Sequence, residues 1–169
     1  MSDVFKEQIV RQYSDTKELA LRISVSLAAG MISFIAINLI GVLGLFITFF
    51  VILGAYHLLS MFNREFEYIF TNGDLDIDCI YSKKKRKRVF AADSNNIEII
   101  VPFSDNSHNK DFEKAAVVKD CSSRKNPQGT YKLLGNYKSR KFMVLFEPNE
   151  SLIAAMLPYL GQRKFIKQL

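Results

Sequence analysis

Residues 23–63 have the sequence ISVSLAAGMISFIAINLIGVLGLFITFFVILGAYHLLSMFN, and these 41 residues include no Asp, Glu, Lys or Arg. One straight helix of this length would measure about 60 Å at ~1.5 Å per residue, twice the ~30 Å apolar thickness of a bilayer. The stretch therefore predicts two membrane-spanning helices. We expect them to be retained, because the apolar core of a signal peptide has only roughly 7–15 residues and directly follows a basic start.

The turn between the two helices is predicted near Asn38, Gly41 and Gly44. An amide side chain and glycines tolerate the backbone angles of a tight turn. The helices are then expected at about 21–38 and 44–62, in a hairpin that occupies residues 21–63.

Basic residues flank the predicted hairpin. Lys17 and Arg22 precede the first helix and Arg64 follows the second, whereas the turn is uncharged. Cytoplasmic flanks carry an excess of Lys and Arg, so both chain ends are predicted on the cytosolic side of a plasma membrane. In that reducing compartment Cys79 and Cys121 are expected to be free thiols.

The segments on either side of the hairpin differ in charge. Residues 1–20 precede it with mixed charges, and we expect them to form an amphipathic lead-in helix. Residues 64–169 contain 19 basic and 13 acidic residues, which accounts for the whole formal charge of +6. This segment is long enough for one small cytosolic domain with its own core.

Alternating hydrophobicity after Arg64 predicts strands. Residues 65–71 and 74–81 alternate with period two, and Asn72-Gly73 between them suits a tight hairpin turn. Five more strands are predicted at 88–92, 97–101, 116–120, 130–137 and 140–147. A C-terminal helix follows, with Asn149 as its N-cap. The predicted fold class is α+β: a transmembrane helical hairpin, then a seven-stranded antiparallel barrel like that of pleckstrin-homology (PH) domains, capped by this helix.

Three features together suggest a family. They are the stretch Phe66-x-Tyr68-x-Phe70-Thr-Asn-Gly-Asp-Leu-Asp-Ile-Asp78, a Lys/Arg run after it, and Phe146-Glu-Pro-Asn149 before the last helix. With the preceding hairpin, this layout resembles a family of small Gram-positive bacterial membrane proteins with two helices and a PH-like cytosolic domain. The resemblance implies a membrane-tethered PH-like domain, and it supplies neither an activity nor functional residues.

The Lys/Arg run consists of six consecutive cations: Lys83, Lys84, Lys85, Arg86, Lys87 and Arg88. Such clusters near the cytosolic leaflet attract anionic lipid headgroups, at about 1 kcal/mol per cation. The alternative is a solvated hairpin turn, in which Lys83–Lys85 form the loop and the arginines face acids on the neighbouring strands. These acids would be Glu65, Glu67, Asp74, Asp76 and Asp78. The pattern leaves both interpretations open.

Other partners and chemistries are not expected. A Lys/Arg run can also bind the phosphates of nucleic acid, but a domain anchored to the inner face of a membrane, with balanced charge elsewhere, is a poor candidate for this. His108 has Asp105 and Ser107 nearby, but neighbours on one polar loop do not provide the geometry of a catalytic triad. Two cysteines do not make a zinc site, and Cys79 is expected in the core. We therefore predict no catalysis, no metal and no cofactor.

Small residues on the hairpin predict close helix packing. Ser26, Gly30 and Gly54 are the main candidates, supported by Ala29 and Ala55. They would pack the two helices together or form the interface of a homo-oligomer. The predicted function is a membrane-tethered binding or scaffold module; the alternative is an accessory structural subunit of a larger membrane complex.

Overall fold

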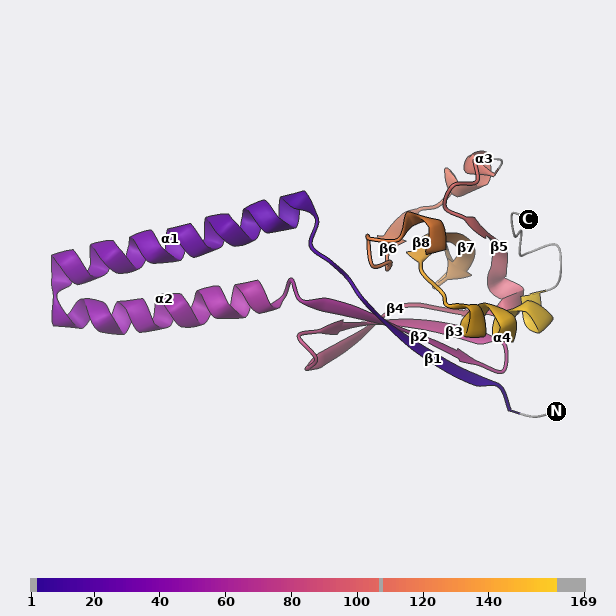
Figure 1. The fold of residues 1–169 in the computed structure, drawn as a ribbon, viewed down its shortest axis with the longest axis horizontal. Coiled ribbons are helices and arrows are strands. Elements are labelled where there is room, and N and C mark those ends of the chain that lie inside the picture. Colours follow the sequence, from indigo (N-terminus) through magenta and orange to yellow (C-terminus); the bar gives the residue numbers. More distant parts are fainter. Residues whose placement is uncertain (1–2, 107, 161–169) are drawn as a thin grey trace. The chain divides into compact units, whose positions relative to one another are not determined.

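The computed structural model describes residues 3–106 and 108–160, which form two compact units. One unit is the hairpin, residues 14–64, and the other combines residues 1–13 with residues 65–169. Figure 1 shows the order of the elements. Each unit is described by itself.

The hairpin consists of α1 (Thr16–Ile40) and α2 (Val42–Ser60), both long and apolar enough to cross a membrane. The two predicted helices are therefore confirmed as elements, and α1 begins earlier than expected. Asp15 caps α1 by accepting a hydrogen bond from the backbone N–H of Thr16. The turn lies at Gly41, which has a φ of 59°. Asn38 does not cap this turn, because its amide donates to the carbonyl of Phe34 within α1.

Charged residues join the two ends of the hairpin. Arg64 forms an ion pair with Glu18. The guanidinium of Arg22 donates to the carbonyl of Phe62 at 3.0 Å and lies over its ring. The basic flanks identified in the sequence thus tie the start of α1 to the end of α2.

The β domain has eight strands in two four-stranded sheets, so the predicted single seven-stranded barrel is wrong. The first sheet has the order β1-β2-β3-β4 and the second β5-β7-β8-β6. The first is built from β1 (Phe5–Arg11), β2 (Arg64–Thr71), β3 (Asp74–Tyr81) and β4 (Lys85–Asp93). The second is built from β5 (Ile97–Pro102), β6 (Val117–Asp120), β7 (Tyr131–Tyr137) and β8 (Arg140–Phe146). Among these, β6 runs parallel to β8, so the sheet is not purely antiparallel.

Short helices connect the strands, and a longer one follows them. A 3-10 turn η1 (Ser94–Asn96), the four-residue α3 (Asn109–Phe112) and a second 3-10 turn η2 (Pro127–Gly129) lie in the connections. Helix α4 (Glu150–Leu160) comes last. The side chain of Asn149 accepts a hydrogen bond from the N–H of Leu152, as its predicted N-cap role requires.

The eighth strand lies in the segment for which the sequence predicts a helix. Residues Phe5–Arg11 form β1, which pairs antiparallel with β2 from Phe5↔Thr71 to Arg11↔Glu65. On β1, the side-chain amide of Gln8 donates to the carbonyl of Glu147 and accepts from the N–H of Asn149. Polar residues that hydrogen-bond to backbone weaken the hydrophobic alternation, so the strand could not be recognised from its own residues.

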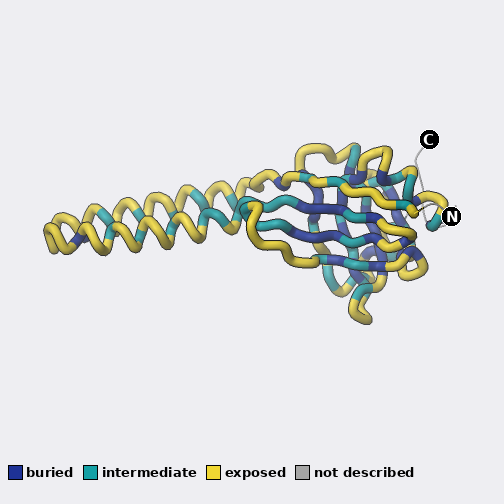
Figure 2. Tube along the Cα trace, turned by 90° about the horizontal axis from the view of Figure 1, so that it is seen from below, coloured by how far each residue is buried: buried dark blue, intermediate teal, exposed yellow. Residues whose placement is uncertain are grey.

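The core lies between the two sheets and under α4. Figure 2 shows the buried strand positions in the β domain. Three aromatic side chains from the first sheet, Phe70, Phe90 and Tyr68, are fully buried. The hydroxyl of Tyr68 donates to the carbonyl of Cys121 at 2.6 Å, so one side chain joins the first sheet to the end of β6. Burial raises the pKa of Tyr68 well above its usual value, so its phenol stays neutral and donates.

Candidate functional site

The basic run forms the turn and first half of the β3–β4 hairpin. Tyr81 pairs with Lys85, which makes Ser82, Lys83 and Lys84 the loop. The loop therefore begins one residue earlier than expected. Ser82 and Lys83 have φ angles of 49° and 58°. A register shift between Ile77 and Asp78 places Asp78 opposite Arg88.

The two arginines of the run are paired with acids, as the solvated-turn interpretation predicts. Arg86 contacts Glu67 at 2.9 Å, and Arg88 contacts Asp76 and Asp78, each at 2.9 Å. The hydrogen bond from Arg88 to Asp78 raises the pKa of the arginine. These arginines hold the outer face of the first sheet together and are not free for a ligand.

Glu67 is the most enclosed acid on this face, with only 3% of its surface exposed. One of its oxygens accepts from Arg86, and the other, Oε2, is buried without a hydrogen-bond donor among the described residues. Burial raises the pKa of Glu67; Arg86 opposes this rise, whereas the nearby carboxylate of Glu7 adds to it. The cost of burying the Glu67 carboxylate is thus partly offset by its ion pair with Arg86.

The lysines of the run differ from the arginines. Lys83, Lys84, Lys85 and Lys87 are all exposed, and among the residues that the structure describes none of them forms an ion pair. Lys87 lies opposite Cys79, hence on the other face of the sheet from the acids. The solvated-turn interpretation placed only Lys83–Lys85 in the loop, away from the acids, and the register adds Lys87 as a fourth such lysine. We call these four residues the lysine tip.

The lysine tip lies at the end of the sheet at which the chain enters from the hairpin. β2 starts at Arg64, and only residues 61–63 separate it from the end of α2 at Ser60. β3 runs back after the two-residue turn Asn72-Gly73, so it ends beside the start of β2. The β3–β4 loop follows immediately. Chain connectivity and strand direction therefore place the four lysines at the strand ends that follow the hairpin.

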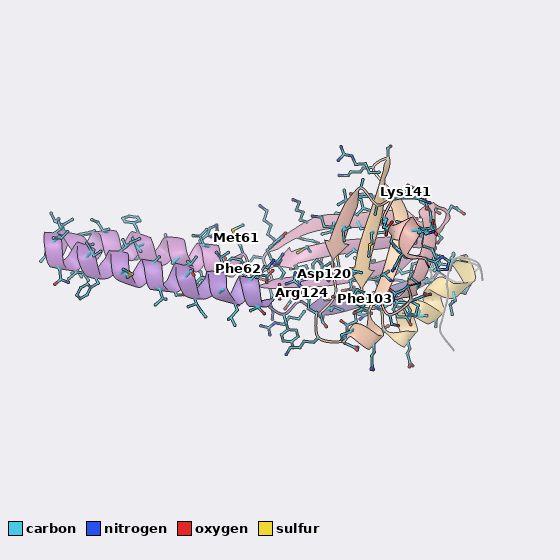
Figure 3. The ribbon with its side chains drawn as sticks, turned by 90° about the horizontal axis from the view of Figure 1, so that it is seen from above. Met61, Phe62, Phe103, Asp120, Arg124 and Lys141 are labelled. Atoms are coloured by element: carbon cyan, nitrogen blue, oxygen red, sulfur yellow. The ribbon has the colours of Figure 1, made fainter. Side chains whose placement is uncertain are left out.

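Other basic residues of the domain are partly neutralised. Arg124 pairs with Asp120 at 2.9 Å, and both lie where β6 ends and its following loop begins (Figure 3). Lys141 pairs with Glu98 at 2.8 Å. Lys125 is different, because its ammonium lies 3.7 Å from the ring centroid of Tyr13. No local pattern predicts this contact, because the two residues are far apart in the chain.

Candidate catalytic groups do not converge within the described residues. His108 lies 3.7 Å from Asp111, whereas the backbone carbonyl of Asp105 accepts from the buried Lys132. Ser107 falls outside the described residues. Cys79 and Cys121 are free, buried thiols, and burial raises the pKa of Cys121 far above the range of a reactive thiolate. Within 3–106 and 108–160, no three acids, histidines or cysteines could hold a metal ion together.

Among the glycines of the hairpin, the predicted helix-packing positions are not the ones with close neighbours. Ser26, Gly30 and Gly54 are exposed, and a Cβ atom at either glycine would meet nothing within 4 Å. The close approach is at Gly44 instead, where a Cβ would lie 2.3 Å from the carbonyl oxygen of Ala36. Neither glycine therefore closely contacts the opposite helix within one hairpin. Their alternative role, in an interface with another molecule, stays a prediction.

These features define a class of protein: an apolar helical hairpin inserted between the first two strands of a two-sheet β domain. The chain belongs to the family described as "Bacterial PH-like domain (DUF6106)", whose model matches residues 2–166. The family resemblance drawn from the sequence is thereby confirmed. Comparison with curated proteins and with solved structures finds no match.

Proposed function

We propose that this protein is a non-catalytic module that the hairpin anchors in the plasma membrane, and that its lysine tip contacts anionic lipid headgroups on the cytosolic leaflet. The observation that carries this proposal is the division of the basic run. Its arginines are neutralised by acids, whereas its four lysines are exposed and have no ion pair among the described residues.

The pairing of β1 with β2 supports the anchoring. These strands flank the hairpin and are hydrogen-bonded neighbours from Phe5↔Thr71 to Arg11↔Glu65. Two strands of one sheet must lie on the same side of a membrane, so a hairpin between them must cross an even number of times. The basic residues Arg22 and Arg64 at its ends favour the cytosol for that side.

Flotation with vesicles tests the lipid contact. The soluble form should keep residues 1–13 and replace the hairpin by a short Gly-Ser linker to Glu65, because β1 belongs to the domain. We expect this domain to float with vesicles that contain phosphatidylglycerol but not with pure phosphatidylcholine. Lys83→Gln with Lys84→Gln should reduce binding about tenfold or more, at about 1 kcal/mol per cation.

A matched variant controls for net charge. Lys110→Gln with Lys114→Gln removes the same two charges from exposed positions around α3, and its binding should stay near that of the parent domain. If both double variants lost the same amount of vesicle binding, the binding would reflect only nonspecific attraction between charges. Binding that does not depend on phosphatidylglycerol would contradict the proposal.

A second candidate function is that of an accessory subunit. It is favoured by the outward position of Ser26, Gly30 and Gly54 on helices whose surfaces are otherwise covered with large apolar side chains. Crosslinking in native membranes through a cysteine at Gly54 tests it. A stoichiometric heteromeric product would support the subunit role, whereas a lack of crosslinked protein would count against it.

A further inference from the structure

Tyr13, just after the end of β1, lies close to two cations. The ammonium of Lys125 is 3.7 Å from the centroid of its ring, and the guanidinium carbon of Arg11 is 6.0 Å from the same point. Tyr13 is 42% exposed. Two cations on one exposed tyrosine are held together by the attraction of each to the ring, despite their mutual repulsion.

The backbone around this group is well fixed. The N–H of Tyr13 donates to the carbonyl of Ser123 at 3.1 Å, which joins the end of β1 to the loop after β6. In that loop, the N–H of Ser123 donates to Glu147 at 3.0 Å and the N–H of Lys125 donates to the hydroxyl of Ser123 at 3.1 Å. The backbone that carries Tyr13 and Lys125 is thus fixed by hydrogen bonds within the domain, and that of Arg11 by its pairing with Glu65 in the sheet.

Both cations keep donors for a ligand. Asp120 pairs with the adjacent Arg124 and therefore does not neutralise Lys125. Glu65 is the cross-strand neighbour of Arg11, but the two side chains form no ion pair. No ion pair to Arg11 or Lys125 occurs in the described part of the chain. Their N–H donors are therefore available to an anion that approaches from solvent.

Chain connectivity brings this group to the start of the hairpin. Only Ser14 and Asp15 separate Tyr13 from Thr16, the first residue of α1. Three steps of extended chain span at most about 10 Å. Tyrosine is enriched where a membrane meets water, because its ring is apolar and its hydroxyl is polar.

We infer that Arg11, Tyr13 and Lys125 form a second headgroup site, in which the two cations bind the phosphate of an anionic lipid and the tyrosine ring lies at the membrane interface. The site rests on the proposed anchoring of the hairpin but not on the lysine tip, which lies on a different strand pair. With contacts on both β1 and the β3–β4 loop, the domain would be held to the leaflet at two points.

Single tryptophans in the full-length protein test the site, because the chain contains none. Tyr13→Trp keeps an aromatic ring and reports quenching by lipids brominated on the acyl chain close to the headgroup. Phe5→Trp is the matched control: Phe5 is exposed at the other end of β1, about 20 Å from Arg11 at ~3.4 Å per residue. We expect strong quenching at position 13 and none at position 5.

The lipid preference is measured with the same reporter. Brominated phosphatidylglycerol should quench the fluorescence of the Tyr13→Trp protein more effectively than brominated phosphatidylcholine at equal mole fraction. Adding Lys125→Gln should lower that preference by up to about fivefold, the factor that corresponds to ~1 kcal/mol per cation. Lys110→Gln with Lys114→Gln should leave it unchanged, because those exposed lysines around α3 belong to neither proposed lipid contact.

Three results would overturn the inference. One is the same quenching at positions 5 and 13, and another is a phosphatidylglycerol preference that Lys125→Gln does not alter. The third is loss of that preference in excess inorganic phosphate at constant ionic strength, which would assign the site to free phosphate. Phe46→Trp in α2 separates these results from a failure of the anchoring itself: an unquenched tryptophan at position 46 would mean that the hairpin is not in the bilayer.

Discussion

The hairpin and the β domain place their large apolar side chains in opposite surroundings. In the hairpin Phe50 is 66% exposed, and only Ala36 and Gly44 are buried in α1 and α2. In the domain Phe70 and Phe90 are fully buried between sheets. The domain therefore supplies its own apolar environment, whereas the hairpin leaves its large apolar side chains exposed, as is typical of helices that are long and apolar enough to cross a membrane. One chain thus contains two units whose stability depends on different surroundings.

The largest expected effect comes from removing the same side chain in both units. Phe70→Ala should destabilise the domain by about 3–5 kcal/mol, because it leaves a cavity beside Tyr159 of α4. Phe50→Ala should leave the domain unaffected. Urea unfolding of both full-length variants, followed by a signal from the domain, measures the difference. Equal losses would show that the two units do not unfold separately.

An introduced arginine is expected to affect the hairpin more than the β domain, the reverse of the order expected for alanine. Position 50 lies near the middle of α2, so Phe50→Arg should cost about 2.5–3.5 kcal/mol of membrane insertion. Phe5→Arg, at a similarly exposed position of β1, should change domain stability by no more than about 0.5 kcal/mol. Carbonate extraction of membranes reports the first and urea unfolding the second. Full membrane retention of Phe50→Arg would contradict a spanning role for α2.

Two glycines of α2 sharpen the comparison within the hairpin. Gly44→Ala should push the helices apart at a cost of about 1–3 kcal/mol, because its Cβ would meet the backbone of Ala36 and Ile37. Gly54→Ala has open space and should be neutral or slightly stabilising. Thermal unfolding in detergent compares them. A destabilising Gly54→Ala would instead point to a partner on that outward surface.

The smallest expected effect is a pH dependence of the domain. Because burial raises the pKa of Glu67 above its ordinary value of 4.5, its contribution to stability is present below that value and is lost as the pH rises through the folded pKa. Glu67→Gln should therefore make the decline in stability between acidic and neutral pH shallower. Urea unfolding at an acidic and at a neutral pH measures how steeply the unfolding free energy declines. If Glu67→Gln does not change this decline, it comes from other acids with a raised pKa, such as Asp76.

Local patterns predicted most of the elements, because each pattern reports on the residues that form it. The uncharged run indicated both helices, and Asn72-Gly73 indicated the hairpin between β2 and β3. All seven predicted strands are present. The eighth, β1, was missed because it includes Gln8, whose partners are backbone groups of a distant segment.

The candidate site was predictable in part. Alternation along β3 and β4 placed Arg86 and Arg88 beside acids, and ion pairs with Glu67, Asp76 and Asp78 result. The predicted loop was displaced by one residue because alternation alone does not show where a turn begins; here Ser82 and Lys83 have the positive φ angles of the turn. The contact between Tyr13 and Lys125 had no sequence signal, since it joins the end of β1 to the loop after β6.

The sequence by itself determined which segment is long and apolar enough to cross a membrane and which segment folds around its own core, because these properties follow from the composition of consecutive residues. Only the tertiary structure decided that the lead-in contributes a strand to the domain, that the sheets remain two, and which cations of the basic run are neutralised by acids. Those outcomes depend on pairing between residues far apart in the chain. Hydrogen bonds and ion pairs of that kind form only when the fold brings both partners together.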